Sequence, residues 1–185
     1  MTTPKSALRR KPSQDLLSDY YWPRVRKYGK RYPKFHWPSV ELLLNLVYTY
    51  EVLSTHFAKR IGRYDLSLST FNVLMILSQS ERGGLKQQDL SRLMLVSRAN
   101  VTGLVDSLVR RGLVVRGPDA KDRRVCMAKI TRKGEELLEH LLPGHYEETA
   151  RVAGAIGHAD KARMNRLFIS LRKQIQPGPK EGGVS

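Results

Sequence analysis

Long apolar runs and cysteines are the two features that this sequence most lacks. Residues 42–50 fall short of the roughly 18 apolar residues of a membrane span and include Asn45, so no membrane partner is expected. The N-terminus has no apolar core and no cleavage site, which argues against a secretory signal. The single cysteine, Cys126, excludes an internal disulfide framework and suits a reducing cytosol. We therefore expect a cytoplasmic protein.

Acidic residues are also scarce, and the charge is unevenly distributed. The chain has 33 Lys and Arg against 17 Asp and Glu, a net charge of +16, and about half of the excess falls in residues 1–40. Basic side chains that neutralise phosphates release condensed counterions, so a polyanionic partner is the natural interpretation. Charge alone leaves DNA, RNA, an anionic membrane surface and a solvated basic tail open.

Motifs for catalysis and for cofactor binding are missing. The sequence has no phosphate loop, no Gly-x-Ser-x-Gly and no nucleophile–base arrangement, so we expect no enzyme activity, catalytic residue or cofactor. The five histidines are scattered, and His140 and His145 do not share a helical face, so no metal site is expected. Cys126 falls in an apolar strand, where cysteine is usually a small filler, and a redox sensor stays open as an alternative.

Helical periodicity dominates the rest of the chain and predicts a mainly α fold. Apolar residues recur at steps of three and four over 39–62, which indicates a long helix with an apolar face wide enough for a dimer interface. A later helix is expected to be kinked at Pro143-Gly144, and Asp160 to cap the last one. The predicted parts are a basic N-terminal extension, a helical dimerisation region in two pieces, a DNA-binding domain and a disordered tail, over residues 1–38, 39–62 with 132–175, 66–131 and 176–185.

The N-terminal extension is expected to be partly disordered, with one short helix over residues 13–22. Ser13 would cap this helix and Pro23 would end or kink it. Residues 24–38 mix basic and aromatic side chains without a clear period, which predicts an irregular linker.

Residues 85–131 carry the most informative pattern, which predicts helix, turn, helix, strand, charged hairpin and strand. In the helix after Ser97, its predicted N-cap, one face is apolar and the other carries small and polar residues. Small residues let the backbone approach base edges, and such helices present their N-terminal residues to the major groove of DNA. Arg suits guanine and Asn suits adenine, so Arg98, Asn100 and Thr102 are the predicted base-reading residues. The alternative is a solvated surface helix.

The hairpin that follows supports the DNA-binding interpretation. Lys121, Arg123 and Arg124 fall at its tip between two apolar strands, and Asp122 is placed to hold an arginine. The negative potential of a minor groove attracts such an arginine. The alternative here is a turn that only adds solubility.

These motifs together resemble one known family. Leu90-x-x-Leu93, the run from Val96 to Leu108, Gly112-Leu113, Asp122-Arg-Arg124 and Ile130-Thr131-x-x-Gly134 are similar to the MarR family of bacterial transcription regulators. The resemblance covers about residues 39–175. It implies a winged helix-turn-helix with a small β-hairpin wing, in a homodimer built from helices at both ends of the chain. It also implies that Arg124 enters the minor groove and that Asp122 braces it.

The N-terminal extension resembles that of the urate-responsive subgroup, which carries an additional helix with a tryptophan. Trp22 and Arg116 stand where that subgroup has ligand residues, but Asn72 replaces an aspartate and Leu104 an arginine, which argues against urate. The resemblance still implies a pocket for a small-molecule effector. Its expected lining residues are Trp22, Trp37, Tyr48, His56, Phe71, Asn72 and Arg116. For any single aromatic residue among them, a plain core position is the simpler interpretation.

Two functions of different classes follow from these patterns. The first is a homodimeric, sequence-specific transcription regulator, a repressor relieved by a ligand, that binds an inverted-repeat operator in double-stranded DNA. The second is an architectural protein that coats DNA through its basic extension, with little regard to sequence. The first predicts a site favoured by roughly 10³ or more, and the second predicts binding that depends steeply on salt but not on sequence.

Overall fold

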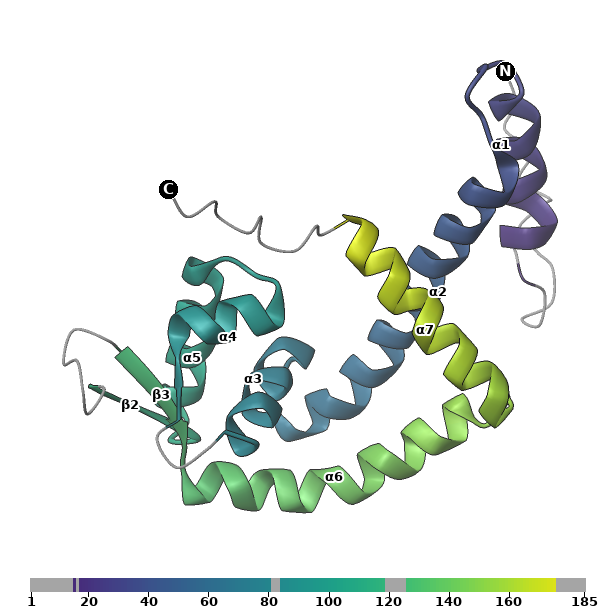
Figure 1. The fold of residues 1–185 in the computed structure, drawn as a ribbon. Coiled ribbons are helices and arrows are strands. Elements are labelled where there is room, and N and C mark those ends of the chain that lie inside the picture. The colour runs from purple at the N-terminus through teal and green to yellow at the C-terminus, as the bar shows by residue number, and fades with distance from the viewer. Residues whose placement is uncertain (1–14, 16, 81–83, 119–125, 176–185) are drawn as a thin grey trace, which may run out of the picture. The chain divides into compact units, whose positions relative to one another are not determined.

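The computed structural model describes Asp15 and residues 17–80, 84–118 and 126–175 of the 185-residue chain (Figure 1). The chain divides into two compact units, the first ending at Leu68 and the second beginning at Ser69. Within the described residues, no helix is both long and apolar enough to cross a bilayer. The predicted helix over residues 13–22 lies partly outside the described residues, and the predicted tail over residues 176–185 lies wholly outside them.

Every regular element that the structure describes in the first unit is a helix or a helical turn. A π-helical turn, η1 (Leu17–Tyr21), leads into α1 (Trp22–Gly29), and α2 (Trp37–Ile61) ends in a 3₁₀ turn, η2 (Gly62–Tyr64). Pro23 lies in the first turn of α1, where its missing N–H and fixed φ are no handicap. Of the two alternatives predicted for Pro23, that it ends a helix is therefore wrong, and that it kinks one stays a prediction. The irregular linker is wrong over residues 24–29, which belong to α1. A second proline places the start of α2 at Trp37 for the same reason.

The second unit contains the remaining helices and one small sheet. Its elements are α3 (Leu68–Ser78, which starts at the boundary), β1 (Leu85–Lys86), α4 (Gln87–Met94), α5 (Arg98–Arg110), β2 (Val114–Pro118), β3 (Cys126–Ile130), α6 (Arg132–Ala153) and α7 (His158–Ile175). The three strands are antiparallel in the order β1-β3-β2. The mainly α fold with a small β-hairpin is thus confirmed. The two-residue strand β1 was not predicted, because two residues are too few to show an alternating pattern.

The buried core of the second unit comes from all of its helices and strands except β1 and α7. Apolar side chains buried there come from α3, α4, α5, β2, β3 and α6, and include Val73, Leu74, Leu77, Leu90, Val101, Val105, Leu108, Val114, Ala128, Leu138 and Leu141. Two backbone turns set the helix-turn-helix geometry within this unit. Leu95 adopts the left-handed conformation at φ 56° and ends α4, and Gly112 at φ 70° ends the run of α5.

One predicted detail of the C-terminal helices needs correction and another stays a prediction. The helix was expected to be kinked at Pro143-Gly144 and to resume after it; α6 does run on past Pro143, from Arg132 to Ala153, and is drawn in green as a gently curved rod in Figure 1. Leu141 and Glu148 are buried on either side of Pro143, so packing outweighs the one lost hydrogen bond. Asp160 lies inside the first turn of α7 and not at its cap, where its charge still favours the helix N-terminus.

Candidate nucleic-acid interface

The first turn of α5 presents the predicted base-reading residues to solvent. Ser97 is the N-cap, and its hydroxyl oxygen accepts from the backbone N–H of Asn100 at 3.2 Å. Arg98 and Asn100 are exposed, whereas the next residue, Val101, is fully buried. The cap therefore fixes the helix start, and the buried valine fixes which side faces outward.

The next turn of α5 is exposed and sterically open. The Thr102 hydroxyl donates to the Arg98 carbonyl at 3.0 Å and lies 3.3 Å from the side-chain amide of Gln87, and the residue is exposed. Gly103 is exposed, and a Cβ at this position would meet nothing within 4 Å. An open backbone next to polar side chains allows another molecule to approach this helix face closely.

Arg116 ties the hairpin strand β2 to the outward helix. Its guanidinium forms an ion pair with Asp106 of α5, and its Nη2 donates to the Thr102 carbonyl at 3.1 Å. With its amide oxygen turned toward Arg116, Gln87 at the start of α4 accepts from Nε at 2.9 Å. Only 30% of the Arg116 side chain is exposed. Arg116 thus joins β2 to both α4 and α5, and these contacts fix the position of the hairpin strand relative to α5.

The same contacts bear on the prediction that Arg116 lines an effector pocket. All of the partners just described belong to the helix-turn-helix and its hairpin. Sequence reasoning missed this function because Asp106 and Arg116 are ten residues apart on different kinds of element. The sequence did offer one signal for this contact. An acidic residue lies on the outward face of the helix, and an arginine lies in the strand that comes next in the chain.

The predicted hairpin-tip residues Lys121, Asp122, Arg123 and Arg124 lie outside the described residues. The strands that flank them are described, and their last pair is Pro118 opposite Cys126. The base of the hairpin is firmly joined to the next helix, since the Thr131 hydroxyl donates to the Gly112 carbonyl at 2.7 Å and also caps α6 through the Gly134 N–H. Cys126 itself is exposed and carries no disulfide.

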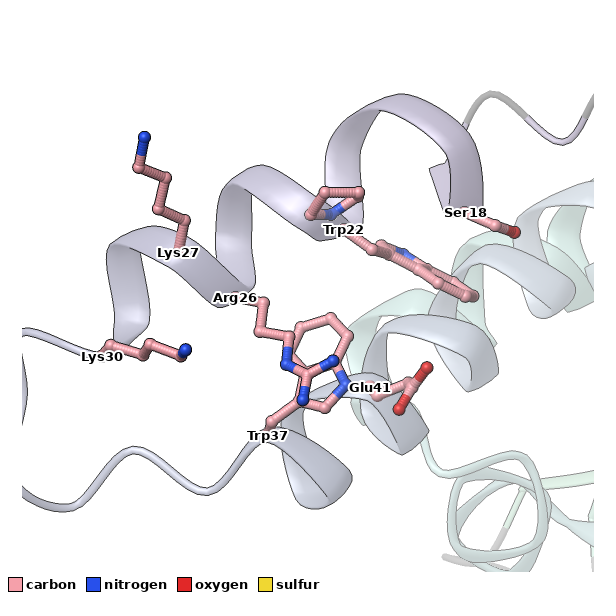
Figure 2. A pocket seen from close by; sticks show the side chains of 8 residues that line it. Ser18, Trp22, Arg26, Lys27, Lys30, Trp37 and Glu41 are labelled. Carbon is pink, nitrogen blue, oxygen red and sulfur yellow. The ribbon is translucent and has the colours of Figure 1, made fainter.

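The other predicted pocket residues are distributed over three helices. Trp22 and Trp37 line one cavity of the first unit, at α1 and the start of α2 (Figure 2). Tyr48 and His56 lie further along α2, with Tyr48 exposed and His56 half-buried. In the second unit, Phe71 is buried and its ring centroid lies 5.0 Å from that of His145. Asn72, beside it on α3, is exposed.

Ion pairs on α6 shift the titration of two arginines. The carboxylate of Glu136 raises the pKa of Arg132 through a hydrogen bond, and Glu148 does the same for the pKa of Arg151. Glu148 is buried and accepts from Arg151 at 2.9 and 2.6 Å. An arginine pKa already lies far above neutral pH, and these contacts raise it further, so both side chains keep their positive charge under ordinary conditions. In the described part of the chain, no three His, Cys, Asp or Glu side chains are placed to hold a metal ion.

Comparison with known proteins places this arrangement among transcription regulators. Residues 64–125 match the family model described as MarR family. The HTH-type transcriptional repressor YetL of Bacillus subtilis is 30% identical over 155 residues, which cover 82% of this chain and 90% of the repressor.

Solved structures share the fold at lower sequence identity. Sco3205 of Streptomyces coelicolor, a MarR family transcriptional regulator crystallised in complex with DNA, superposes with a TM-score of 0.73 at 19% identity, covering 78% of this chain and 95% of Sco3205. CouR of Rhodococcus jostii RHA1, crystallised with p-coumaroyl-CoA, superposes with a TM-score of 0.62 at 24% identity, covering 77% of this chain and 95% of CouR.

Proposed function

This chain belongs to the MarR family of transcription regulators, and from that premise we propose that it is a dimeric repressor of a specific DNA operator. The observation that carries the proposal is the first part of α5, a capped helix start with exposed Arg98 and Asn100 beside the open backbone of Gly103. Repression, as in the name of the relative YetL, follows if the bound protein blocks polymerase at a promoter.

The proposed contacts divide between the two grooves of the duplex. Arg98, Asn100 and Thr102 read base edges in the major groove, where Arg suits guanine and Asn suits adenine. Arg124 enters the minor groove braced by Asp122, while Lys121 and Arg123 hold phosphates. Ser97 acts indirectly by fixing the helix start.

A homodimer is proposed because apolar side chains remain exposed on helices at both ends of the chain. On α2, Leu42, Val47 and Tyr50 are 57%, 60% and 65% exposed, and on α7 Leu167 is 59% exposed. Such a surface favours association with a second copy. Two copies that face the same side of the duplex need half-sites about one helical turn, or about 10 bp, apart.

The test of the proposed function compares DNA from upstream of the chain's own gene with a scrambled duplex. Fluorescence anisotropy at two salt concentrations is expected to show a preference of roughly 10³ or more for the specific site, retained at the higher salt. Equal binding to both duplexes that disappears as salt rises would refute the proposal and favour the architectural, DNA-coating alternative.

Arg116 supplies a second test, which addresses the link between the hairpin and α5. We expect Arg116→Lys and Asp106→Asn each to weaken operator binding by about tenfold, because lysine cannot span Asp106 and the Thr102 carbonyl together. The double variant should lose little more than either single variant, since both remove the same contact. Anisotropy titrations measure the affinities, and circular dichroism checks that the helices remain. Additive losses would show that the two side chains act separately.

A further inference from the structure

One face of α1 and of the turns beside it carries an alternating row of tyrosines and arginines, the Tyr–Arg row: Tyr20, Arg24, Tyr28 and Arg31. Cζ of Arg24 lies 3.6 Å from the centroid of the Tyr20 ring, and its Nη1 donates to the Tyr20 carbonyl at 2.7 Å. Arg31 lies over the Tyr28 ring at 4.3 Å. Arg24 and Tyr28 are four residues apart in α1 and are therefore neighbours on its surface. The row is thus continuous from η1 to the turn that follows α1.

The Tyr–Arg row lies on the solvent side of α1. Trp22, Val25 and Gly29, which are spaced three and four residues apart, are half-buried or buried and mark the inward side of this helix, which contacts α2. Tyr20 and Tyr28 remain 37% and 61% exposed although an arginine stacks on each ring. The residues that line the cavity of Figure 2 do not include any member of the row. The row is therefore a separate surface feature with aromatic rings open to a partner.

The surroundings of the row are strongly basic. Residues 20–40 contain six Lys and Arg and no Asp or Glu, and all six basic residues are exposed. A second copy of the same face would be repelled by this charge, so the charge favours a polyanionic partner. A strand of phosphates is such a partner, because its neutralisation releases condensed counterions.

The exposed tyrosines distinguish between three kinds of polyanionic partner. In a duplex the base faces are stacked on one another, so a tyrosine ring on the protein surface has no base face to contact. Insertion into an anionic membrane relies on Trp, Phe and Leu, but Trp22, Phe35 and Trp37 of this region are all half-buried. The unpaired bases of a single strand stack on aromatic rings and on guanidinium planes, and both are present in the row.

We propose that the Tyr–Arg row binds single-stranded nucleic acid, either DNA or RNA. Unpaired bases stack on Tyr20 and Tyr28 and on the arginines between them, and phosphates pair with the cations beside the row. Lys27 is one of these cations, and Figure 2 shows its side chain pointing away from the cavity. This binding goes beyond the proposed function, which assigns the reading of duplex DNA to α5 in the second unit, and it does not depend on that function.

The test is fluorescence anisotropy of the full-length chain with labelled strands of about 12 nucleotides. Oligothymidylate and oligouridylate carry bases, and a strand of abasic deoxyribose units carries the same number of phosphates without them. We expect the tighter of the two base-carrying strands, which identifies DNA or RNA as the partner, to bind at least about tenfold more tightly than the abasic strand. This ratio should persist as salt rises, because salt weakens the phosphate contacts of all three strands. Equal affinity for the abasic strand would overturn the proposal, since charge alone would then explain the binding.

Matched variants locate the binding on the row. Tyr20→Ala and Tyr28→Ala keep the charge of the chain and should each weaken strand binding by about tenfold. Arg24→Lys also keeps the charge but removes the planar group, and should weaken it by about fivefold. Tyr146→Ala is the control, because Tyr146 of α6 is a comparably exposed tyrosine, at 56%, in the other unit. Circular dichroism checks that the helices remain. An equal loss in Tyr146→Ala, or full affinity in all three row variants, would show that the row is not the site.

Binding to the operator duplex and to membranes is measured on the same variants. Tyr28→Ala should keep its operator affinity within about twofold, because Tyr28 is not among the proposed base-reading residues. Equal losses of operator and strand affinity would make the row part of the duplex-binding surface and overturn the proposal. Vesicles of phosphatidylserine and phosphatidylcholine are the remaining probe. Vesicle binding that disappears in Tyr28→Ala would assign the row to a membrane instead.

The operator titration keeps the two proposals apart. If the chain shows no preference for an operator, the proposed function fails while the comparison of base-carrying and abasic strands is unaffected. If the operator preference is found but the base-carrying strands bind no better than the abasic strand, the proposal for the Tyr–Arg row fails and the DNA-reading proposal remains.

Discussion

Replacing Arg98 with alanine is expected to weaken binding to the operator by about tenfold to hundredfold and to relax the sequence preference at one base pair of each half-site. Arg98 is exposed in the first turn of a helix whose start is fixed by the Ser97 cap, so its side chain is open to solvent at a defined position of the backbone. A bidentate contact from arginine to guanine contributes about 1–3 kcal/mol of discrimination against the wrong base. The measurement is a set of anisotropy titrations with operator duplexes substituted at each position in turn.

Arg110→Ala is the matched control for this prediction. Arg110 is an exposed arginine of the same helix, in its last turn, three helical turns from the cap. Its removal takes away the same charge and should alter operator and scrambled DNA to the same small extent, because charge alone carries no sequence information. If Arg98→Ala and Arg110→Ala behave alike, α5 binds DNA only through charge, and the assignment of Arg98 as a base-reading residue is wrong.

The second helix of the helix-turn-helix, α5, was predictable because both of its boundaries have a local chemical cause. Ser97 is a good cap, Gly112 permits the positive φ that ends the helix, and Val101 marks the buried face. The sheet was predictable only in part. The strand β1 forms by pairing with β3, and its two residues are too few to show an alternation of apolar and polar side chains. The wrong expectation at Pro23 has the same origin as the correct ones: proline can open or end a helix, and only the packing after it decides which.

The predictions for the functional site show the same difference between local patterns and contacts made by distant segments. Arg98, Asn100 and Thr102 lie on a single helix and were predicted from their residue types and their place near its start, and their roles in reading DNA stay a prediction. Arg116 was assigned to an effector pocket because of its position in a resemblance, yet its guanidinium is occupied by Asp106 and the Thr102 carbonyl. Contacts between distant segments, such as this one or Arg26 over Trp37, leave no periodic trace in a sequence.

Two helical glycines are expected to respond in opposite directions to the same substitution. Gly134 lies in the first turn of α6, and an added Cβ would be 2.4 Å from the Leu113 carbonyl oxygen and 2.7 Å from Cγ1 of Ile130. Both neighbours belong to the base of the hairpin and are themselves buried, so the helix start and the strands must separate. We expect Gly134→Ala to lower the free energy of unfolding by about 1–3 kcal/mol, even though alanine is the better helix former.

Gly103→Ala is the control, because the same atom is added to a helix where nothing lies within 4 Å. Alanine should raise the free energy of unfolding there by about 0.8–1 kcal/mol, through helix propensity alone. For a chain of 185 residues, 1 kcal/mol corresponds to a change of about 2–4 °C in Tm, which thermal unfolding at one fixed protein concentration resolves. If Gly134→Ala were as stable as Gly103→Ala, α6 would not approach the hairpin as closely as the structure places it.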